Sequence, residues 1–422
     1  MINRLQSLLS GERPHLYAVL DIGTVEAKAL VVLVENEQAA IVGVGREAHA
    51  QGAVQDGGIA NTEALAAACE KALANAEALT ETVMGEQLVA DRAVLGISGP
   101  VLKSTYVSLA APRARPADRI TEGELRALLQ RAERLALQQA RSELAMETGS
   151  PAVDVGLVDA DVVQILVDGY RVSSPVRLQG RQLEVRVFNL FAPLDFLAAV
   201  NSVAAALELE PVMILAGPCL VGRVLARGDA IVIDIGGECT DVVLLRGGGI
   251  ERMRTLPMGG LSFTRRVGRT LGVPVMAAEE IKKSYAAGRL DWARTEEVRA
   301  ALTADVRTWL DAVQALLEEM AASDTLPPRV LLCGGGAALP DLERAARSYP
   351  WVRLLPFTRY PEIIVLQPSH MTGASDRTRR LVGESFVVPA ALAAWTVRSL
   401  HSQGGDLPQQ SLQRVLHGMR LS

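Results

Sequence analysis

The stretch that decides the fold is AIVIDIGGECTDVVLL at residues 230–245, where two apolar runs flank an acidic, glycine-containing turn. A similar stretch, YAVLDIGTVEAKALVVLV, lies at residues 17–34, and both have an aspartate two residues before a glycine. Apolar runs bounded by turn residues predict buried strands, so each stretch predicts a strand, a tight turn and a return strand. The repeat predicts two related α/β halves that face each other across a cleft.

Helices are expected between and after these strands. Residues 62–79 have apolar residues at helical spacing, and Thr121 with Glu124 three residues later forms a capping box at the start of a long helix. This helix and the strand-like runs after it predict a compact α+β insert between the two halves.

The composition argues against several classes of protein. The 422 residues carry a net charge of -5, so we do not expect a nucleic-acid binder with a basic face. The four cysteines have no CxxC or Cys/His spacing, which argues against a disulfide framework and a zinc site. No apolar run reaches the roughly 20 residues of a spanning helix, and the N-terminus lacks the apolar core of a secretion signal. We therefore expect a cytoplasmic protein.

The two acidic turns predict a phosphate site. A carboxylate at a strand end can orient hydrated Mg²⁺, and exposed turn amides can hold phosphate oxygens. Lys28 follows Asp21 by seven residues and is expected to point back toward the turn. One such turn is more often a plain hairpin tip, but two on facing halves would clamp a polyphosphate from both sides.

Two further features could hold the rest of a ligand. Glu279 and Lys282 stand three residues apart on an expected helix and share a face, although a solvated ion pair is the commoner use of that spacing. The glycines at residues 334–336 precede another expected helix, where the backbone can pass close to a flat base or a sugar.

In this order, the motifs resemble those of the actin/Hsp70/sugar-kinase ATPase superfamily. LDIGTVEAKAL is similar to its first phosphate motif, VIDIGGECTDVVLL to its second and VLLCGGGAALPDLERAA to its adenosine motif. GPCLVGRVLA and FVVPAALAAW resemble its two connecting helices. Within the superfamily the chain resembles the FtsA cell-division family over about residues 15–400, because DGYRV and SPVRLQGRQLEVRVFNLFAP are similar to that family's insert.

The resemblance implies an α/β, actin-like two-lobed ATPase fold with duplicated ribonuclease-H-like halves and an SHS2-type insert. It implies five units along the chain: the first lobe (subdomain 1A) at 14–91, 190–226 and 372–400; the insert (1C) at 92–189; the second lobe (2A) at 227–262 and 323–371; a reduced subdomain 2B at 263–322; and a linker with an amphipathic helix at 401–422.

The resemblance also implies ATP and Mg²⁺ as ligands, with Asp21 and Asp234 holding Mg²⁺ through water. The residues it implies for nucleotide binding are Asp21, Gly23, Thr24, Lys28, Asp234, Gly236, Gly237, Thr240, Gly259, Gly260, Glu279, Lys282, Gly334, Gly335 and Gly336. Glu238 stands where the family usually has a third glycine, and no residue matches a catalytic carboxylate. We therefore identify no catalytic residue and expect at most a weak ATPase.

The function implied by the resemblance is a self-assembling adaptor that links the division-ring protein FtsZ, a tubulin homologue, to the inner face of the cytoplasmic membrane. The stretch 285–308 is short compared with that of the family. This predicts that a small hairpin of subdomain 2B, which is part of the usual contact with FtsZ, is missing. The tail would bind an anionic membrane through side chains at helical spacing: Leu412, Val415, Leu416 and Met419. A PilM-like pilus-assembly adaptor that binds ATP and a small-molecule kinase of the same superfamily remain as alternatives.

Overall fold

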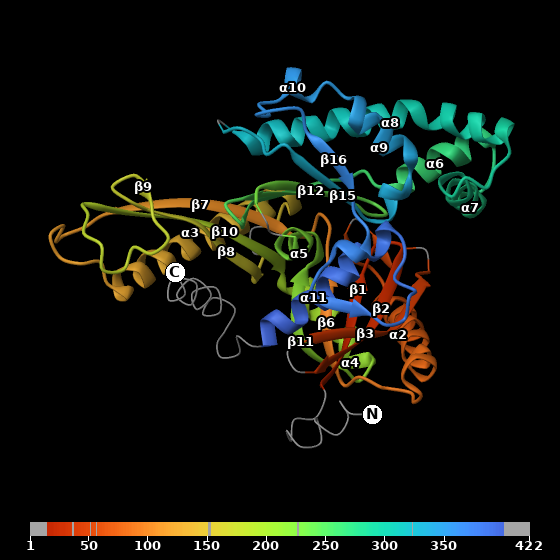
Figure 1. Ribbon diagram of the computed structural model, residues 1–422, viewed down its shortest axis with the longest axis horizontal. Coiled ribbons are helices and arrows are strands. Elements are labelled where there is room, and N and C mark those ends of the chain that lie inside the picture. Colours follow the sequence, from red (N-terminus) through yellow and green to blue (C-terminus); the bar gives the residue numbers. More distant parts are fainter. Residues whose placement is uncertain are drawn as a thin grey trace.

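The structure is a computed structural model that describes residues 15–35, 38–50, 52–55, 57–150, 153–225, 228–322 and 324–400. Two lobes and an insert that projects to one side make up this part of the chain (Figure 1). No helix within these ranges is long and apolar enough to cross a bilayer. The linker and the predicted membrane helix, residues 401–422, lie outside them.

The first lobe is built on a six-stranded sheet with the order β11–β6–β1–β2–β3–β17. Its strands are β1 (His15–Ile22), β2 (Glu26–Glu35), β3 (Gln38–Ala48), β6 (Arg92–Ile97), β11 (Glu210–Ala216) and β17 (Ala374–Asp376). Helices α2 (Thr62–Met84) and α4 (Leu194–Ala206) belong to the same lobe. Residues 29–32 are completely buried, which explains why β2 reads as an uninterrupted apolar run.

The second lobe repeats the same hairpin with a parallel neighbour. Its five-stranded sheet has the order β14–β13–β12–β15–β16. The strands are β12 (Ala230–Ile235), β13 (Thr240–Arg246), β14 (Gly249–Leu256), β15 (Arg329–Cys333) and β16 (Glu362–Val365). The helices are α6 (Gly260–Leu271), α7 (Val275–Ala286), α8 (Trp292–Ala321), α9 (Pro340–Ser348) and α10 (Trp351–Leu354).

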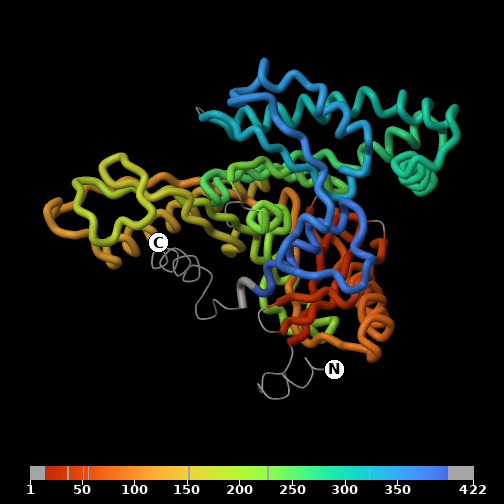
Figure 2. Tube along the Cα trace, in the orientation of Figure 1, coloured from red at the N-terminus to blue at the C-terminus, as the bar shows by residue number. Residues whose placement is uncertain are grey.

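Two helices join the lobes, α5 (Gly217–Val224) and α11 (Val387–Leu400), and they pack against each other. Figure 2 shows the blue C-terminal segment running back from the second lobe to the first. Alternation along β12 sends Ile231 and Ile233 into the core of the second lobe, while Val232 packs into the core of the first. The second sheet therefore contributes to both cores.

The insert is a four-stranded sheet packed against one long helix. Its sheet has the order β7–β10–β8–β9, formed by β7 (Lys103–Pro112), β8 (Val155–Val167), β9 (Tyr170–Arg171) and β10 (Gln182–Pro193). The helix α3 (Glu122–Thr148) begins at the predicted capping box, which is confirmed because Thr121 and Glu124 bond each other's backbone amides.

The predicted boundary of the insert at residue 92 is wrong. Strand β6 pairs in parallel with β1 on one side and β11 on the other, so it belongs to the first sheet, and β10 continues the insert to Pro193. Residues 263–322 form helices without a strand and share the core of the second lobe instead of building their own. The stretch 285–308 holds the end of α7 and the first part of α8.

Short elements complete the described chain. These are β4 (Val54–Gln55), β5 (Gly58–Ile59) and the 3₁₀ turns η1 (Gly335–Ala338), η2 (Pro368–His370) and η3 (Glu384–Phe386).

Candidate functional site

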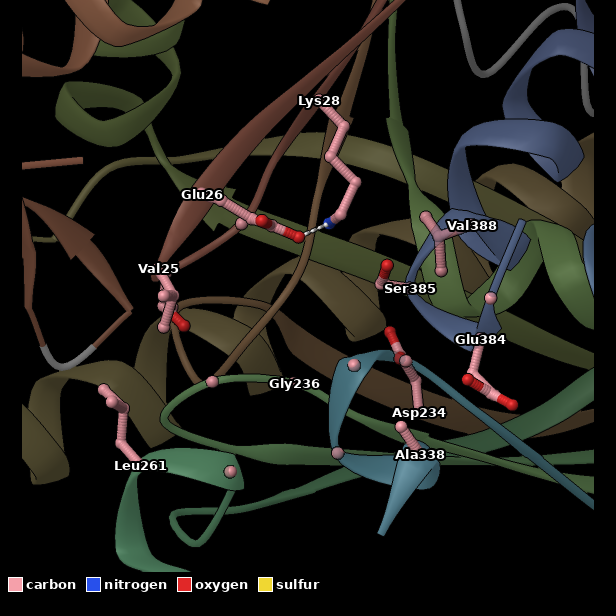
Figure 3. A pocket seen from close by; sticks show the side chains of 18 of the residues that line it. Val25, Glu26, Lys28, Asp234, Gly236, Leu261, Ala338, Glu384, Ser385 and Val388 are labelled. Carbon is pink, nitrogen blue, oxygen red and sulfur yellow. Dashed lines mark ion pairs between the residues drawn. The ribbon is translucent and has the colours of Figure 1, made fainter. Parts of the chain in front are cut away.

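A cavity of about 420 Å³ lies between the lobes, where the β1–β2 and β12–β13 turns meet. Most residues predicted to bind a nucleotide line it: Asp21, Gly23, Thr24, Lys28, Asp234, Gly236, Gly237, Gly260, Glu279, Lys282, Gly334, Gly335 and Gly336. Figure 3 places Asp234 and Lys28 on opposite sides of this space, with Glu384 and Ser385 beside them. The two acidic turns therefore meet at one cavity, as the internal repeat predicted.

The first turn sets a lysine against two carboxylates. Asp21 and Lys28 are direct cross-strand neighbours, and Lys28 Nζ lies 3.1 Å from Asp21 Oδ2 and 3.6 Å from Glu26 Oε1. Burial alone would lower the pKa of Lys28, but the charges of Asp21 and Glu26 outweigh it and raise this pKa. The ammonium group is therefore held in its charged form at the floor of the cavity.

The second turn holds two facing carboxylates. Asp234 and Asp241 are opposite each other in the β12–β13 pair, and both are buried. Burial, with the nearby charges of Asp241 and Asp21, raises the pKa of Asp234 to about 7. Burial also raises the pKa of Asp241 to about 6. Asp241 Oδ2 accepts a hydrogen bond of 3.1 Å from the Gly99 amide and so ties the lobes together.

The tips of the two turns touch. The amide of Glu238 donates to Thr24 Oγ1 at 3.2 Å, and a Cβ on Gly237 would lie only 2.3 Å from Val25 Cγ2. The lining of the cavity includes Gly237 and Cys239 on either side of Glu238 but not Glu238 itself. The backbone of this turn, and not the carboxylate that replaces the expected glycine, therefore faces the cavity.

The other end of the cavity is formed by α6 and α7. Lys282 Nζ lies 2.7 Å from Glu279 Oε2 and donates to Thr264 Oγ1 at 2.7 Å and to the Gly260 carbonyl at 3.0 Å. The Lys282 and Glu279 side chains are only 11% and 19% exposed, so this is no solvated surface pair. Burial lowers the pKa of Lys282, whereas the ammonium outweighs burial at Glu279 and lowers the pKa of that carboxyl.

Two predicted residues lie behind the cavity, which corrects their assignment. Thr240 points to the opposite face of β13 from Asp241, where its hydroxyl donates to the Met258 carbonyl and accepts from Trp309 Nε1. Gly259 packs against the second turn, and a Cβ there would come within 2.6 Å of the Gly237 carbonyl oxygen. Both residues support the turn without lining the cavity.

Several lining residues were not predicted. They include Arg46, Ser98, Cys239, Asp241, Lys283, Arg289, Val382, Gly383, Glu384, Ser385 and Val388. The sequence signal for residues 382–385 is that Gly383 precedes a helix, as the glycines at 334–336 do, and this signal alone does not assign them to the cavity. Three of the five lysines in the chain line the cavity, namely Lys28, Lys282 and Lys283.

The residues at the turns fit a magnesium–nucleotide complex. Asp21, Asp234 and Asp241 bring buried carboxylates to the cavity, and Lys28 pairs with the first of them. Buried carboxylates need a compensating cation, and oxygen donors suit Mg²⁺. In the described part of the chain, no group of three or more His, Cys, Asp or Glu side chains is arranged as a complete metal site.

Replacing Asp234 by asparagine is expected to stabilise the ligand-free protein at alkaline pH. The folded pKa of about 7 exceeds the ordinary 3.8, so the folded state holds this proton more tightly. The stability that results is present at low pH and is lost as pH rises from about 4 to 7. Asp234→Asn should raise the free energy of unfolding by up to roughly 4 kcal/mol at pH 8 and by less at pH 5. Equal gains in thermal melts at both pH values would contradict this assignment.

Comparison with known proteins agrees with the geometry. The family model described as "Cell division protein FtsA" matches residues 231–375. The curated FtsA of Neisseria meningitidis is 26% identical over 65% of this chain and 62% of its own length. The FtsA of Bacillus subtilis is 24% identical over 79% of this chain and 76% of its own length. The match to the Neisseria protein thus spans under two thirds of that relative.

Solved structures show the same fold. A chain of the "PilM-PilN type IV pilus biogenesis complex" superposes with a TM-score of 0.63 and 21% identity, covering 90% of this chain and 98% of that one. The ethanolamine utilization protein EutJ from Carboxydothermus hydrogenoformans gives a TM-score of 0.50 at 16% identity, covering 91% and 90%.

Fold and cavity together define a protein of the actin-like ATPase fold, as the sequence predicted. Within this class the chain is similar to FtsA proteins, because the family model that matches residues 231–375 and the curated relatives bear the FtsA name. The resemblance inferred from the motifs is therefore confirmed.

Proposed function

We propose that the chain is an ATP-binding cell-division protein that self-assembles and links the division ring to the inner face of the cytoplasmic membrane. The observation that carries the proposal is the meeting of Asp21 and Asp234 at one interlobe cavity. Magnesium, held by these two carboxylates through water, would neutralise the charge of a bound triphosphate. The site residues are proposed in the roles implied by the resemblance, Thr240 and Gly259 excepted.

Each part of the cavity has a task in this proposal. Lys28 and the amides near Gly23 and Gly237 take the phosphates, since charged and backbone N–H donors suit phosphate oxygens. Glu279 and Lys282 hold the nucleoside end. No lining residue is assigned to activate water, so hydrolysis is slow or absent. Bound nucleotide would set the angle between the lobes and thereby the surface used for assembly into filaments.

Nucleotide titration tests the site. Wild type is expected to bind a fluorescent ATP analogue with Mg²⁺. Lys28→Ala and Asp234→Ala should each weaken binding at least tenfold, because the first removes the cation beside the phosphates and the second removes a carboxylate that holds Mg²⁺. Lys103→Ala is the matched control, since Lys103 pairs with Glu147 of the insert and does not line the cavity. Unchanged affinity in both cavity variants would refute the site.

A second candidate function is a pilus-assembly adaptor, favoured by the fold similarity to the PilM chain. The FtsA relatives and the insert sequence favour division instead. Pull-down with an FtsZ C-terminal peptide and with a pilus-protein N-terminal peptide separates the two, since only the first should be retained. A small-molecule kinase would require a catalytic carboxylate beside a substrate pocket, which we do not assign. ADP release in the presence of any sugar would favour that function.

Membrane attachment rests on the tail alone. Residues 411–422 are proposed to lie in an anionic surface, with many copies in a filament adding their weak affinities. Flotation with anionic vesicles should be lost on deletion of these residues, and unchanged flotation would remove this part of the proposal.

A further inference from the structure

Arg46 is a cavity residue to which the motifs assign no role. It lies on β3, directly opposite Lys28 on β2, which in turn lies directly opposite Asp21 on β1. Directly opposed residues of antiparallel strands project to the same face of a sheet. Asp21, Lys28 and Arg46 therefore form one row across three strands, and all three line the cavity.

The two cations in this row, Lys28 and Arg46, differ in whether a carboxylate neutralises them. Lys28 is buried and paired with Asp21 and Glu26. Arg46 is exposed at the rim, and among the residues that the structure describes no carboxylate forms an ion pair with it. The neighbouring Glu47 pairs with Lys71 instead. The row thus ends in a guanidinium that is free to contact a ligand in the cavity.

We infer that Arg46 binds the terminal phosphate of a nucleoside triphosphate held between the lobes. The inference rests on the proposed function and adds a specificity residue to it. A planar guanidinium can donate two parallel hydrogen bonds to phosphate oxygens, which an ammonium cannot do. Arg46 belongs to the first-lobe side of the cavity, beside Glu26 and Lys28, whereas Glu279 and Lys282 occupy the second-lobe side.

In this position Arg46 would distinguish a bound nucleoside triphosphate from a diphosphate. A diphosphate lacks the group that the guanidinium binds, so Arg46 would favour the triphosphate complex over the diphosphate complex. Arg46 is therefore a specificity residue and not a catalytic one, since no step of hydrolysis is assigned to it.

The test is titration of the full chain with Mg²⁺-ATP and Mg²⁺-ADP. Arg46→Gln should weaken ATP binding roughly tenfold and leave ADP binding unchanged, because one charged hydrogen-bonding group is lost. Arg46→Lys should restore part of the preference, since it keeps the charge but loses the fork. Lys71→Gln removes one positive charge from the same lobe outside the cavity, and both affinities should stay at wild-type values.

The outcomes separate this inference from the proposed function. If wild type binds both nucleotides and Arg46→Gln weakens both equally, or neither, the terminal-phosphate role is overturned while the nucleotide site stands. If wild type binds neither nucleotide, the proposed function and the inference fail together. Arg46→Gln is expected to melt at the wild-type temperature, since the Arg46 side chain is exposed. A loss of affinity in this variant would then not be due to unfolding.

Discussion

Arg223→Ala should lower the free energy of unfolding by about 3–5 kcal/mol, because it leaves buried carboxylates without their cation. Arg223 lies on α5 and its Nη1 is 2.5 Å from Asp159 Oδ2, with side chains 7% and 5% exposed. Its Nη2 is 3.4 Å from Asp161 Oδ2, which also accepts the Ile250 amide at 3.2 Å. Trp395 of α11 lies 5.7 Å from the guanidinium. One side chain thus links both connecting helices, the insert and the second lobe.

The matched control is Arg141→Ala. Arg141 is 3.2 Å from Asp154, but the two side chains are 50% and 75% exposed, so the loss should be at most about 1 kcal/mol. Denaturant unfolding of both variants measures the difference. If Arg223→Ala does not fold, Asp161→Asn should still give a measurable loss, because Asp161 is only 28% exposed. Equal losses for Arg223→Ala and Arg141→Ala would contradict the account.

Gly334→Ala should be the most damaging single-methyl change in the cavity. The φ of Gly334 is +82°, and an added Cβ would lie 2.2 Å from Asp234 Oδ1 and 2.6 Å from the Ile235 carbonyl oxygen. The left-handed backbone and the overpacking together should cost about 2–5 kcal/mol of stability. Because the clash displaces Asp234, nucleotide affinity should fall as well.

Gly335→Ala provides the control within the same turn. An added Cβ there meets Ser385 Cβ at 3.7 Å, which is an ordinary van der Waals distance. Melting temperatures of the two variants should therefore differ clearly, with Gly335→Ala close to wild type. A Gly334→Ala protein as stable as Gly335→Ala would show that the glycine turn at residues 334–336 does not pack tightly against Asp234.

The closeness of Asp21 and Lys28 could be predicted from the sequence, because it depends only on a tight turn between two neighbouring strands. The sequence predicts that Lys28 points back toward the turn, and the register places it directly opposite Asp21. Thr240 was misassigned although alternation could have excluded it: Asp241 is opposite Asp234, so the neighbouring Thr240 must face the other side.

Arg46 could not be predicted in the same way. The β2–β3 pair contains an irregularity between Val31 and Val32, and a shift of one residue in register moves a side chain to the opposite face. The segment from Val382 to Ser385 is far along the chain from both acidic turns, and nothing local in the sequence indicates that the fold brings it to the cavity. The start of the insert was misplaced for a similar reason, because the apolar run of β6 fits a buried strand in either sheet.

The structure of the protein with Mg²⁺ and a non-hydrolysable ATP analogue tests the central claim most directly. The account predicts the triphosphate between the β1–β2 and β12–β13 turns, with Mg²⁺ reached through water by both Asp21 and Asp234. A nucleotide bound by only one of the two turns, or at another surface of the molecule, would contradict it.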